Sequence, residues 1–253
     1  MQENEETFLS HLVELRQRLV RCLVVFALAC APMLYFSAEL YDMLAMPLMA
    51  NLPEGARMIA TGVITPFLIP VKISFMAAFV AVLPFILHQV WAFVAPGLYA
   101  HEKRLALPLV VSSTLLFVAG MLFCYFVVFG GVFRFIASFA PKSIAVAPDI
   151  EAYFNFALGM FLAFGLAFEV PVVVVVLVLM GIVNVEQLRE WRGYVIVGIF
   201  VIAAVVTPPD VVSQIALAVP MCLLYEVGIF FGRGIEKRRK VPAETGTGAE
   251  FKG

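Results

Sequence analysis

The segment Ala152–Val185, with the sequence AYFNFALGMFLAFGLAFEVPVVVVVLVLMGIVNV, contains one charged residue, Glu169. About 20 apolar residues are enough for a helix to cross the hydrocarbon core of a bilayer, so this segment is long enough to span a membrane. The strands of a membrane β-barrel alternate apolar and polar residues, and the run Val172–Val176 does not alternate. The segment therefore predicts a membrane-spanning helix with an acid near its middle.

The rest of the chain has the same apolar character. Its 253 residues are 63% hydrophobic and 14% charged, whereas soluble domains carry about 25% charged residues. We therefore predict an all-α polytopic membrane protein with six transmembrane helices in a membrane domain of residues 1–234. A basic and then polar tail, residues 235–253, is expected to be disordered. The expected spans are residues 19–38, 71–94, 108–133, 153–181, 193–207 and 211–231.

The distribution of Lys and Arg predicts the orientation of these spans. Of the 17 Lys and Arg residues, 13 fall on one side of the expected spans and 4 on the other. Because segments rich in Lys and Arg stay in the cytoplasm, both termini are expected there. The long loop Glu39–Pro70, the loop Phe135–Glu151 and the tight turn Thr207–Asp210 are then external.

The tight turn limits the length of the last two spans. The segment Gly193–Val206 would form about 21 Å of helix, which is shorter than the roughly 30 Å hydrocarbon core. We therefore expect short fifth and sixth helices and a locally thinned bilayer. Alternatively, Leu188–Arg192 also enter the membrane interface, with Trp191 as an aromatic anchor.

Catalytic and metal-binding motifs are absent from the sequence. It contains no metalloprotease, serine-hydrolase, P-loop or dinucleotide-binding fingerprint. A pair of acids sharing one site is not expected either, since Asp42, Asp149 and Asp210 fall in external segments. We therefore expect no enzyme activity, no cofactor and no metal. The cysteines are interpreted as buried apolar side chains and the histidines are scattered: Cys22, Cys30, Cys124, Cys222, His11, His88 and His101.

Two acids at the cytoplasmic border are candidate binding groups. Glu14 precedes the first span and Glu102 lies between the second and third. Local pairing explains both equally well from spacing alone, because Glu14 is four residues from Arg18 and Glu102 is next to Lys103 and Arg104.

Several segments together resemble the TatC family, the multispanning subunit of the twin-arginine protein translocase. The resemblance runs from about Thr7 to Arg233 and covers all but the termini. It is carried by HLVELRQR at 11–18, AMP at 45–47, QVWAFVAPGLY at 89–99, HEKR at 101–104, FEVP at 168–171 and TPPDVVSQ at 207–214.

The resemblance implies a receptor rather than an enzyme. Members of the family bind the twin-arginine signal peptides of folded substrates in the bacterial inner membrane. They work with TatA- and TatB-type single-span partners, using the proton-motive force, and self-association is expected but not nucleic-acid binding. By position, Glu14 and Glu102 match the acids for the twin-arginine motif, with Phe93 and Arg16 in the same region. The remaining matches are Glu169 in a concave, cupped membrane face, Gln214 at the start of the sixth helix, and Pro47 and Asp210 in external segments.

A second interpretation rests on the residues alone. An acid inside a membrane span often marks an ion or solute path. Glu169, with Glu226 as a second acid, would then serve a proton- or ion-coupled small-solute transporter. The two hypotheses differ in the acids on which function depends, because a transporter needs Glu169 and a signal receptor needs Glu14 and Glu102.

Overall fold

The computed structural model describes residues 2–50, 57–94, 106–139, 147–207 and 211–240. Within these ranges every regular element is a helix, and one isolated bridge pairs Ile59 with Asp149. The all-α prediction is therefore confirmed. The elements are α1 (Gln2–Tyr35), α2 (Ser37–Met49), α3 (Thr65–Val94), α4 (Ala106–Phe123), η3 (Cys124–Val128), α5 (Phe129–Phe139), α6 (Ile150–Ala167), α7 (Val170–Leu179), α8 (Val185–Glu190), α9 (Arg192–Val206) and α10 (Val211–Lys240).

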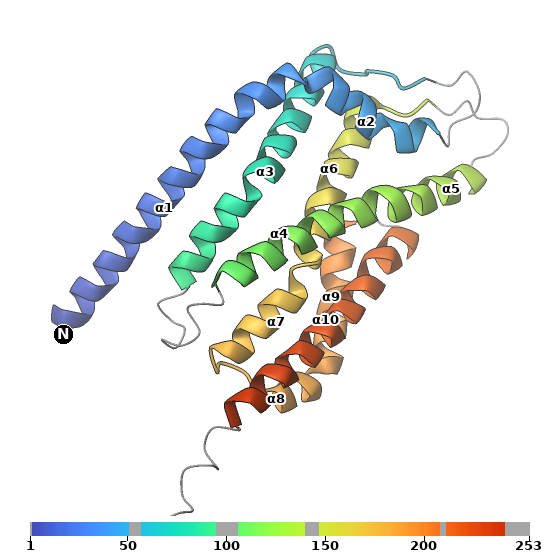
Figure 1. Ribbon diagram of the computed structural model, residues 1–253. Coiled ribbons are helices and arrows are strands. Elements are labelled where there is room, and N and C mark those ends of the chain that lie inside the picture. The colour runs from blue at the N-terminus through green and yellow to red at the C-terminus, as the bar shows by residue number, and fades with distance from the viewer. Residues whose placement is uncertain (1, 51–56, 95–105, 140–146, 208–210, 241–253) are drawn as a thin grey trace, which may run out of the picture.

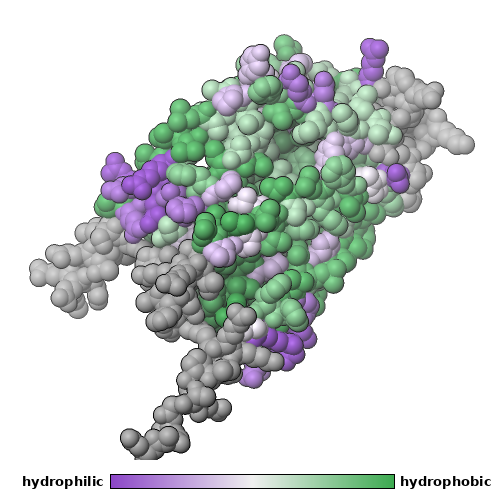
Figure 2. All heavy atoms as spheres, in the orientation of Figure 1, coloured by the Kyte–Doolittle hydropathy of each residue, from purple (hydrophilic) through white to green (hydrophobic). Residues whose placement is uncertain are grey.

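Five helical segments of the described chain are long and apolar enough to cross a membrane, and α9 is a shorter apolar helix. In Figure 1 the long helices run obliquely in a common direction, with α1 and α3 side by side. Figure 2 shows hydrophilic surface near the two ends of these helices and apolar surface between them. This distribution is that of a multi-pass membrane protein. The candidate segments are Leu12–Tyr35, Thr65–Phe93, Leu107–Phe135, Ile150–Leu179 and Val211–Glu236.

The prediction that helix 6 is short is wrong. α9 has 15 residues, as expected for a short fifth helix, but α10 has 30 and ends at Lys240. The uncharged window ends at Tyr225, because Glu226 follows it. Glutamate is a good helix former, so the helix continues through Glu226, which accepts a hydrogen bond of 2.6 Å from Arg192 at the start of α9. α10 also enters the predicted tail, of which residues 241–253 lie outside the described ranges.

The long first loop, which was expected to be external, contains a helix that was not predicted. α2 buries Leu44, Ala45 and Leu48 on one face, and this spacing is helical. Pro47 suggested a break, because proline cannot donate a backbone hydrogen bond to the carbonyl four residues earlier. That carbonyl belongs to Met43, and the Tyr125 hydroxyl donates to it instead, over 2.8 Å.

The predicted span 153–181 is two helices with a break in the middle. α6 ends at Ala167 and α7 begins at Val170, with Pro171 in its first turn. Pro171 has no N–H for the carbonyl of Ala167, and it disfavours a regular helix through this point. Glu169 is the residue immediately before α7, so the acid of this span lies at the helix break.

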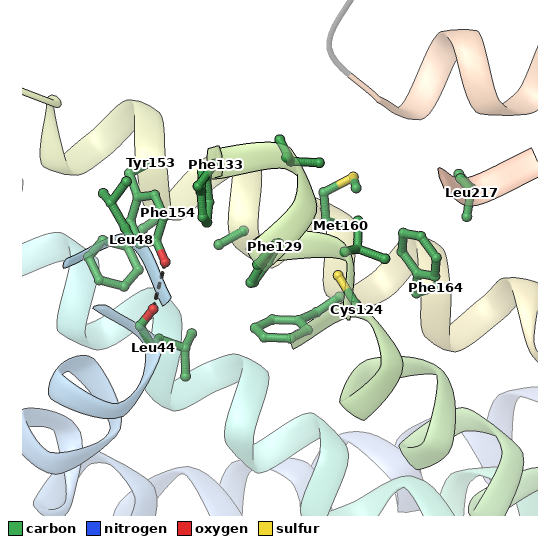
Figure 3. Close-up of a cluster of buried hydrophobic side chains, with 14 of the residues drawn as sticks. Leu44, Leu48, Cys124, Phe129, Phe133, Tyr153, Phe154, Met160, Phe164 and Leu217 are labelled. Carbon is green, nitrogen blue, oxygen red and sulfur yellow. Dashed lines mark hydrogen bonds between the residues drawn. The ribbon is translucent and has the colours of Figure 1, made fainter. Parts of the chain in front are cut away.

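A core of aromatic side chains joins α5 and α6. Figure 3 shows Phe129 of α5 in the same cluster as Phe154 and Met160 of α6, and all three are less than 2% exposed. Lipid tails are as apolar as these side chains, so close van der Waals packing rather than exclusion of water favours the association of helices inside a membrane.

Two glycines permit the close contact between α4 and α6. A Cβ at Gly120 would lie 2.4 Å from the carbonyl oxygen of Phe164, and one at Gly165 would lie 2.5 Å from the ring of Phe117. Small residues of this kind let helix backbones approach each other in membranes. The packing holds α4 against the end of α6, next to the break that contains Glu169.

Candidate functional site

Glu14 lies on α1 and pairs with Arg18 one turn later. Arg18 donates to Glu14 Oε1 from Nη2 over 2.5 Å and from Nε over 3.1 Å. The local pairing expected from the i,i+4 spacing is therefore present. The two side chains are only partly exposed, 37% for Glu14 and 20% for Arg18.

The same arginine reaches the end of α3. Arg18 Nη1 donates to Gln89 Oε1 over 3.2 Å, and Nη2 donates to the carbonyl oxygen of Ala92 over 3.3 Å. The last carbonyls of a helix lack partners within it and carry partial negative charge, so a guanidinium is favourable there. Ala92 precedes the half-buried Phe93. The structure thus brings Glu14 close to the turn of α3 that contains Phe93.

Of the other two candidates for the same site, one is placed elsewhere on α1 and one is not described. Arg16 is exposed, and it lies two residues from Glu14, on the other side of α1. Glu102 lies outside the described residues. Of the four residues predicted to bind the signal, the structure therefore gathers Glu14 and Phe93, and it adds Arg18 and Gln89, which the sequence did not indicate as site residues.

Glu169 is in a different environment. Its carboxylate faces the hydroxyl of Ser113 on α4, but Oε1 of Glu169 and Oγ of Ser113 are both buried and make no hydrogen bond within the described part of the chain. A carboxylate without a hydrogen-bonded partner is costly inside a membrane. The helix break thus contains an acid with unmet hydrogen-bonding capacity at Oε1.

Gln214 links the last two helices. Its Nε2 donates to the carbonyl oxygen of Phe200 on α9 over 3.3 Å. This bond ties the start of α10 to the end of α9. Asp210, in the turn between these helices, lies outside the described residues.

Pro47 lies on α2, a helix that contacts the aromatic core. The Tyr125 hydroxyl donates to Met43, and the Tyr153 hydroxyl donates to the carbonyl oxygen of Leu44 over 2.6 Å, drawn as a dashed line in Figure 3. Both tyrosines are distant from α2 in sequence, so spacing gave no signal for either.

A second polar contact surrounds Asp149, which caps the start of α6. It accepts hydrogen bonds from Thr61 Oγ1 over 2.7 Å and from the backbone N–H groups of Thr61 and Ala152. The bond from the Thr61 hydroxyl, followed by that from the Ala152 N–H, holds the pKa of Asp149 below its usual value. Glu151 nearby accepts a hydrogen bond from Thr65 over 3.1 Å. The segment before α3 is thereby fastened to the start of α6.

Metal-binding groups are not gathered in the described ranges, where no three His, Cys, Asp or Glu side chains cluster. The polar contacts instead lie at the two ends of the apolar helices, with one buried acid between them. The fold and these contacts define the class of the protein as a helical, multi-pass membrane protein.

Comparisons with known proteins give the family. Residues 10–220 match the family described as Sec-independent protein translocase protein (TatC), so the chain belongs to the TatC family. It is similar to the Sec-independent protein translocase protein TatC of Azotobacter chroococcum mcd 1, with 52% identity over 244 residues, 96% of each chain. It is 48% identical to the protein of the same name from Escherichia coli (strain K12) over 231 residues, 91% of this chain and 90% of that one.

A solved structure agrees with this assignment. The crystal structure of the twin arginine translocase receptor TatC has a TM-score of 0.78 with this chain and is 38% identical to it, covering 89% of this chain and 99% of that one. The protein is therefore a component of a Sec-independent protein translocase. It is a transport protein rather than a catalytic enzyme.

Proposed function

We propose that the chain is the signal-peptide-binding core subunit of the twin-arginine translocation system in the bacterial inner membrane. It exports folded proteins with TatA- and TatB-type partners, driven by the proton-motive force, and self-associates in a complex. The observation that carries the proposal is the Glu14 carboxylate, held by Arg18 beside the last turn of α3. Glu102, Phe93 and Arg16 are proposed to complete the same site.

The chemistry of this end of the protein fits arginine recognition. A guanidinium pairs with a carboxylate through two parallel hydrogen bonds, whereas an ammonium offers a point charge. Two acids, Glu14 and Glu102, on separate segments would each pair with one arginine of the signal. Two such bidentate pairs favour a signal with two arginines over one with two lysines.

The membrane arrangement proposed with this function has six spans in a cupped arrangement and cytoplasmic termini. Its support is α9, which adds a sixth apolar helix to the five longer candidates. At 1.5 Å per residue, α9 is about 22 Å long, so the bilayer is expected to be thinned beside it. Glu169 would provide a polar position on the cupped face for a partner helix, with Gln214 joining the last two helices and Pro47 and Asp210 shaping the external side.

Crosslinking of a twin-arginine signal peptide tests the proposal. Glu14→Ala or Glu102→Ala should abolish crosslinking while the protein still inserts into the membrane. A peptide with both arginines changed to lysine is the matched control. Undiminished crosslinking in both variants would refute the signal-binding role.

Glu169 supports the second candidate function, a proton- or ion-coupled small-solute transporter. Its buried Oε1 without a hydrogen bond is the observation in favour. Glu226, the other acid of that hypothesis, is paired with Arg192 and about half exposed, which weakens it. Solute uptake that depends on Glu169 and is independent of Glu14 would favour the transporter.

A further inference from the structure

Arg18 forms hydrogen bonds with two helices at once. Its guanidinium donates four: two to Glu14 of α1, one to Gln89 and one to the Ala92 carbonyl of α3. Glu14 and Arg18 alone, as an i,i+4 pair on one helix, would contribute little. The bonds to α3 are different, because they fix the guanidinium relative to a second helix 71 to 74 residues away in sequence.

The acceptors on α3 suit a permanently charged group. Gln89 is 8% exposed, so its side-chain oxygen is poorly solvated. The Ala92 carbonyl lies in the last turn of α3, where the helix carries partial negative charge. Both acceptors are oxygen atoms of α3, so they bind the guanidinium to that helix.

We infer that Arg18 is a positioning residue, which holds the Glu14 carboxylate against the end of α3 in the orientation that receives a signal-peptide arginine. The inference rests on the proposed function. Both of the Arg18 bonds to Glu14 go to one oxygen, Oε1. A signal-peptide arginine that binds Glu14 would share this carboxylate with Arg18. The acceptors on α3 offset the repulsion between the two guanidinium groups.

Only an arginine can fill this role. Its planar fork reaches Glu14, Gln89 and the Ala92 carbonyl together, whereas the ammonium of a lysine is a point charge on a flexible stem. Arg18→Lys keeps the charge beside Glu14 but loses the fork. Gln89→Leu keeps the pair of Glu14 and Arg18 but removes one acceptor on α3. Gln89→Glu keeps an acceptor oxygen at the same position.

The experiment measures binding of two labelled signal peptides, one with two arginines and one with two lysines, to the full-length protein in nanodiscs. We expect Arg18→Lys and Gln89→Leu to weaken binding of the arginine peptide about tenfold, since a hydrogen bond to a charged group is lost. Preference for arginine over lysine should fall in both variants. Gln89→Glu should restore both quantities. Arg21→Lys, an exposed position on the next turn of α1, is the matched control and should bind like the unchanged protein.

The outcomes separate the two proposals. If Glu14→Gln binds the arginine peptide normally, the proposed function itself fails. If Glu14→Gln loses binding while Arg18→Lys and Gln89→Leu keep both affinity and preference, only the positioning role is overturned. Equal loss in Gln89→Leu and Gln89→Glu would also overturn it, because the acceptor oxygen would then be irrelevant.

Discussion

The contact between α1 and the end of α3 and the break between α6 and α7 hold their acids in opposite ways. Glu14 is paired with an arginine that is itself bound to the neighbouring helix. Glu169 has a serine in front of it and a buried oxygen without a hydrogen bond in the described chain. Glu14 is thus held beside a second helix, whereas Glu169 lies inside the apolar region, where a carboxylate oxygen without a hydrogen bond is costly. The difference suggests that the first acid recognises a cation and the second serves a later step.

The largest expected effect comes from reversing the charge at Glu14. Glu14→Lys places a positive charge next to Arg18, and this charge repels the arginines of the signal. Export of a twin-arginine substrate should fall about 30-fold or more, as expected for breaking a close charge pair. An export assay in cells that contain equal amounts of inserted protein measures this. Glu39→Lys, an exposed acid on α2, is the control and should export normally; equal export in both variants would contradict the comparison.

Removing the Glu169 carboxylate should stabilise the protein but reduce export. Glu169→Leu eliminates a buried carboxylate and should stabilise the purified protein against unfolding by about 1–3 kcal/mol. The same change should leave signal-peptide binding intact and reduce export. Thermal unfolding, peptide binding and export are measured on one set of variants, with Glu169→Gln as the variant that keeps a polar group. A loss of stability in Glu169→Leu would mean that the Glu169 carboxylate makes a stabilising contact and is not the unmatched acid described above.

The hydrogen bond from Tyr125 to α2 provides a test with a smaller expected effect. Tyr125→Phe removes the donor to the Met43 carbonyl and should destabilise the protein by about 1 kcal/mol. After Pro47→Ala, position 47 has its own N–H for that carbonyl, so Tyr125→Phe should then matter less. Unfolding of the two single variants and the double variant gives the coupling. Additive effects would show that the tyrosine does not replace the missing helical bond.

The smallest effect concerns Asp149. Its pKa is lowered by the Thr61 hydroxyl and by backbone N–H groups, so its charged form stabilises the folded protein above the unfolded pKa. That contribution is lost as the pH falls through the folded pKa, below the usual value of about 3.9. Asp149→Asn should therefore reduce the decline of the melting temperature in this acidic range. An unchanged decline would show that these hydrogen bonds do not lower the pKa of Asp149.

The sequence predicts the class of fold well, because long apolar segments leave few alternatives in a membrane. It fails where residues distant in sequence satisfy a polar group. Glu226 lies within the last helix and accepts a hydrogen bond from Arg192. Pro47 lies within α2, and the Tyr125 hydroxyl donates to the Met43 carbonyl that a residue with an N–H at position 47 would have bonded.

The candidate site was predictable in part for the same reason. Glu14 and Phe93 were identified from motifs, and the packing of α1 along α3 brings their segments together. Arg18 was expected to pair with Glu14, but its bonds to Gln89 and the Ala92 carbonyl depend on the contact between two helices. No spacing within either segment indicates them.

The most direct test of the account compares the two acids in one binding measurement. Purified protein with Glu14→Gln or Glu169→Gln is incubated with a labelled twin-arginine signal peptide, and the retained peptide is measured. The account predicts that Glu14→Gln loses the peptide and Glu169→Gln retains it. Retention by Glu14→Gln together with loss by Glu169→Gln would contradict it.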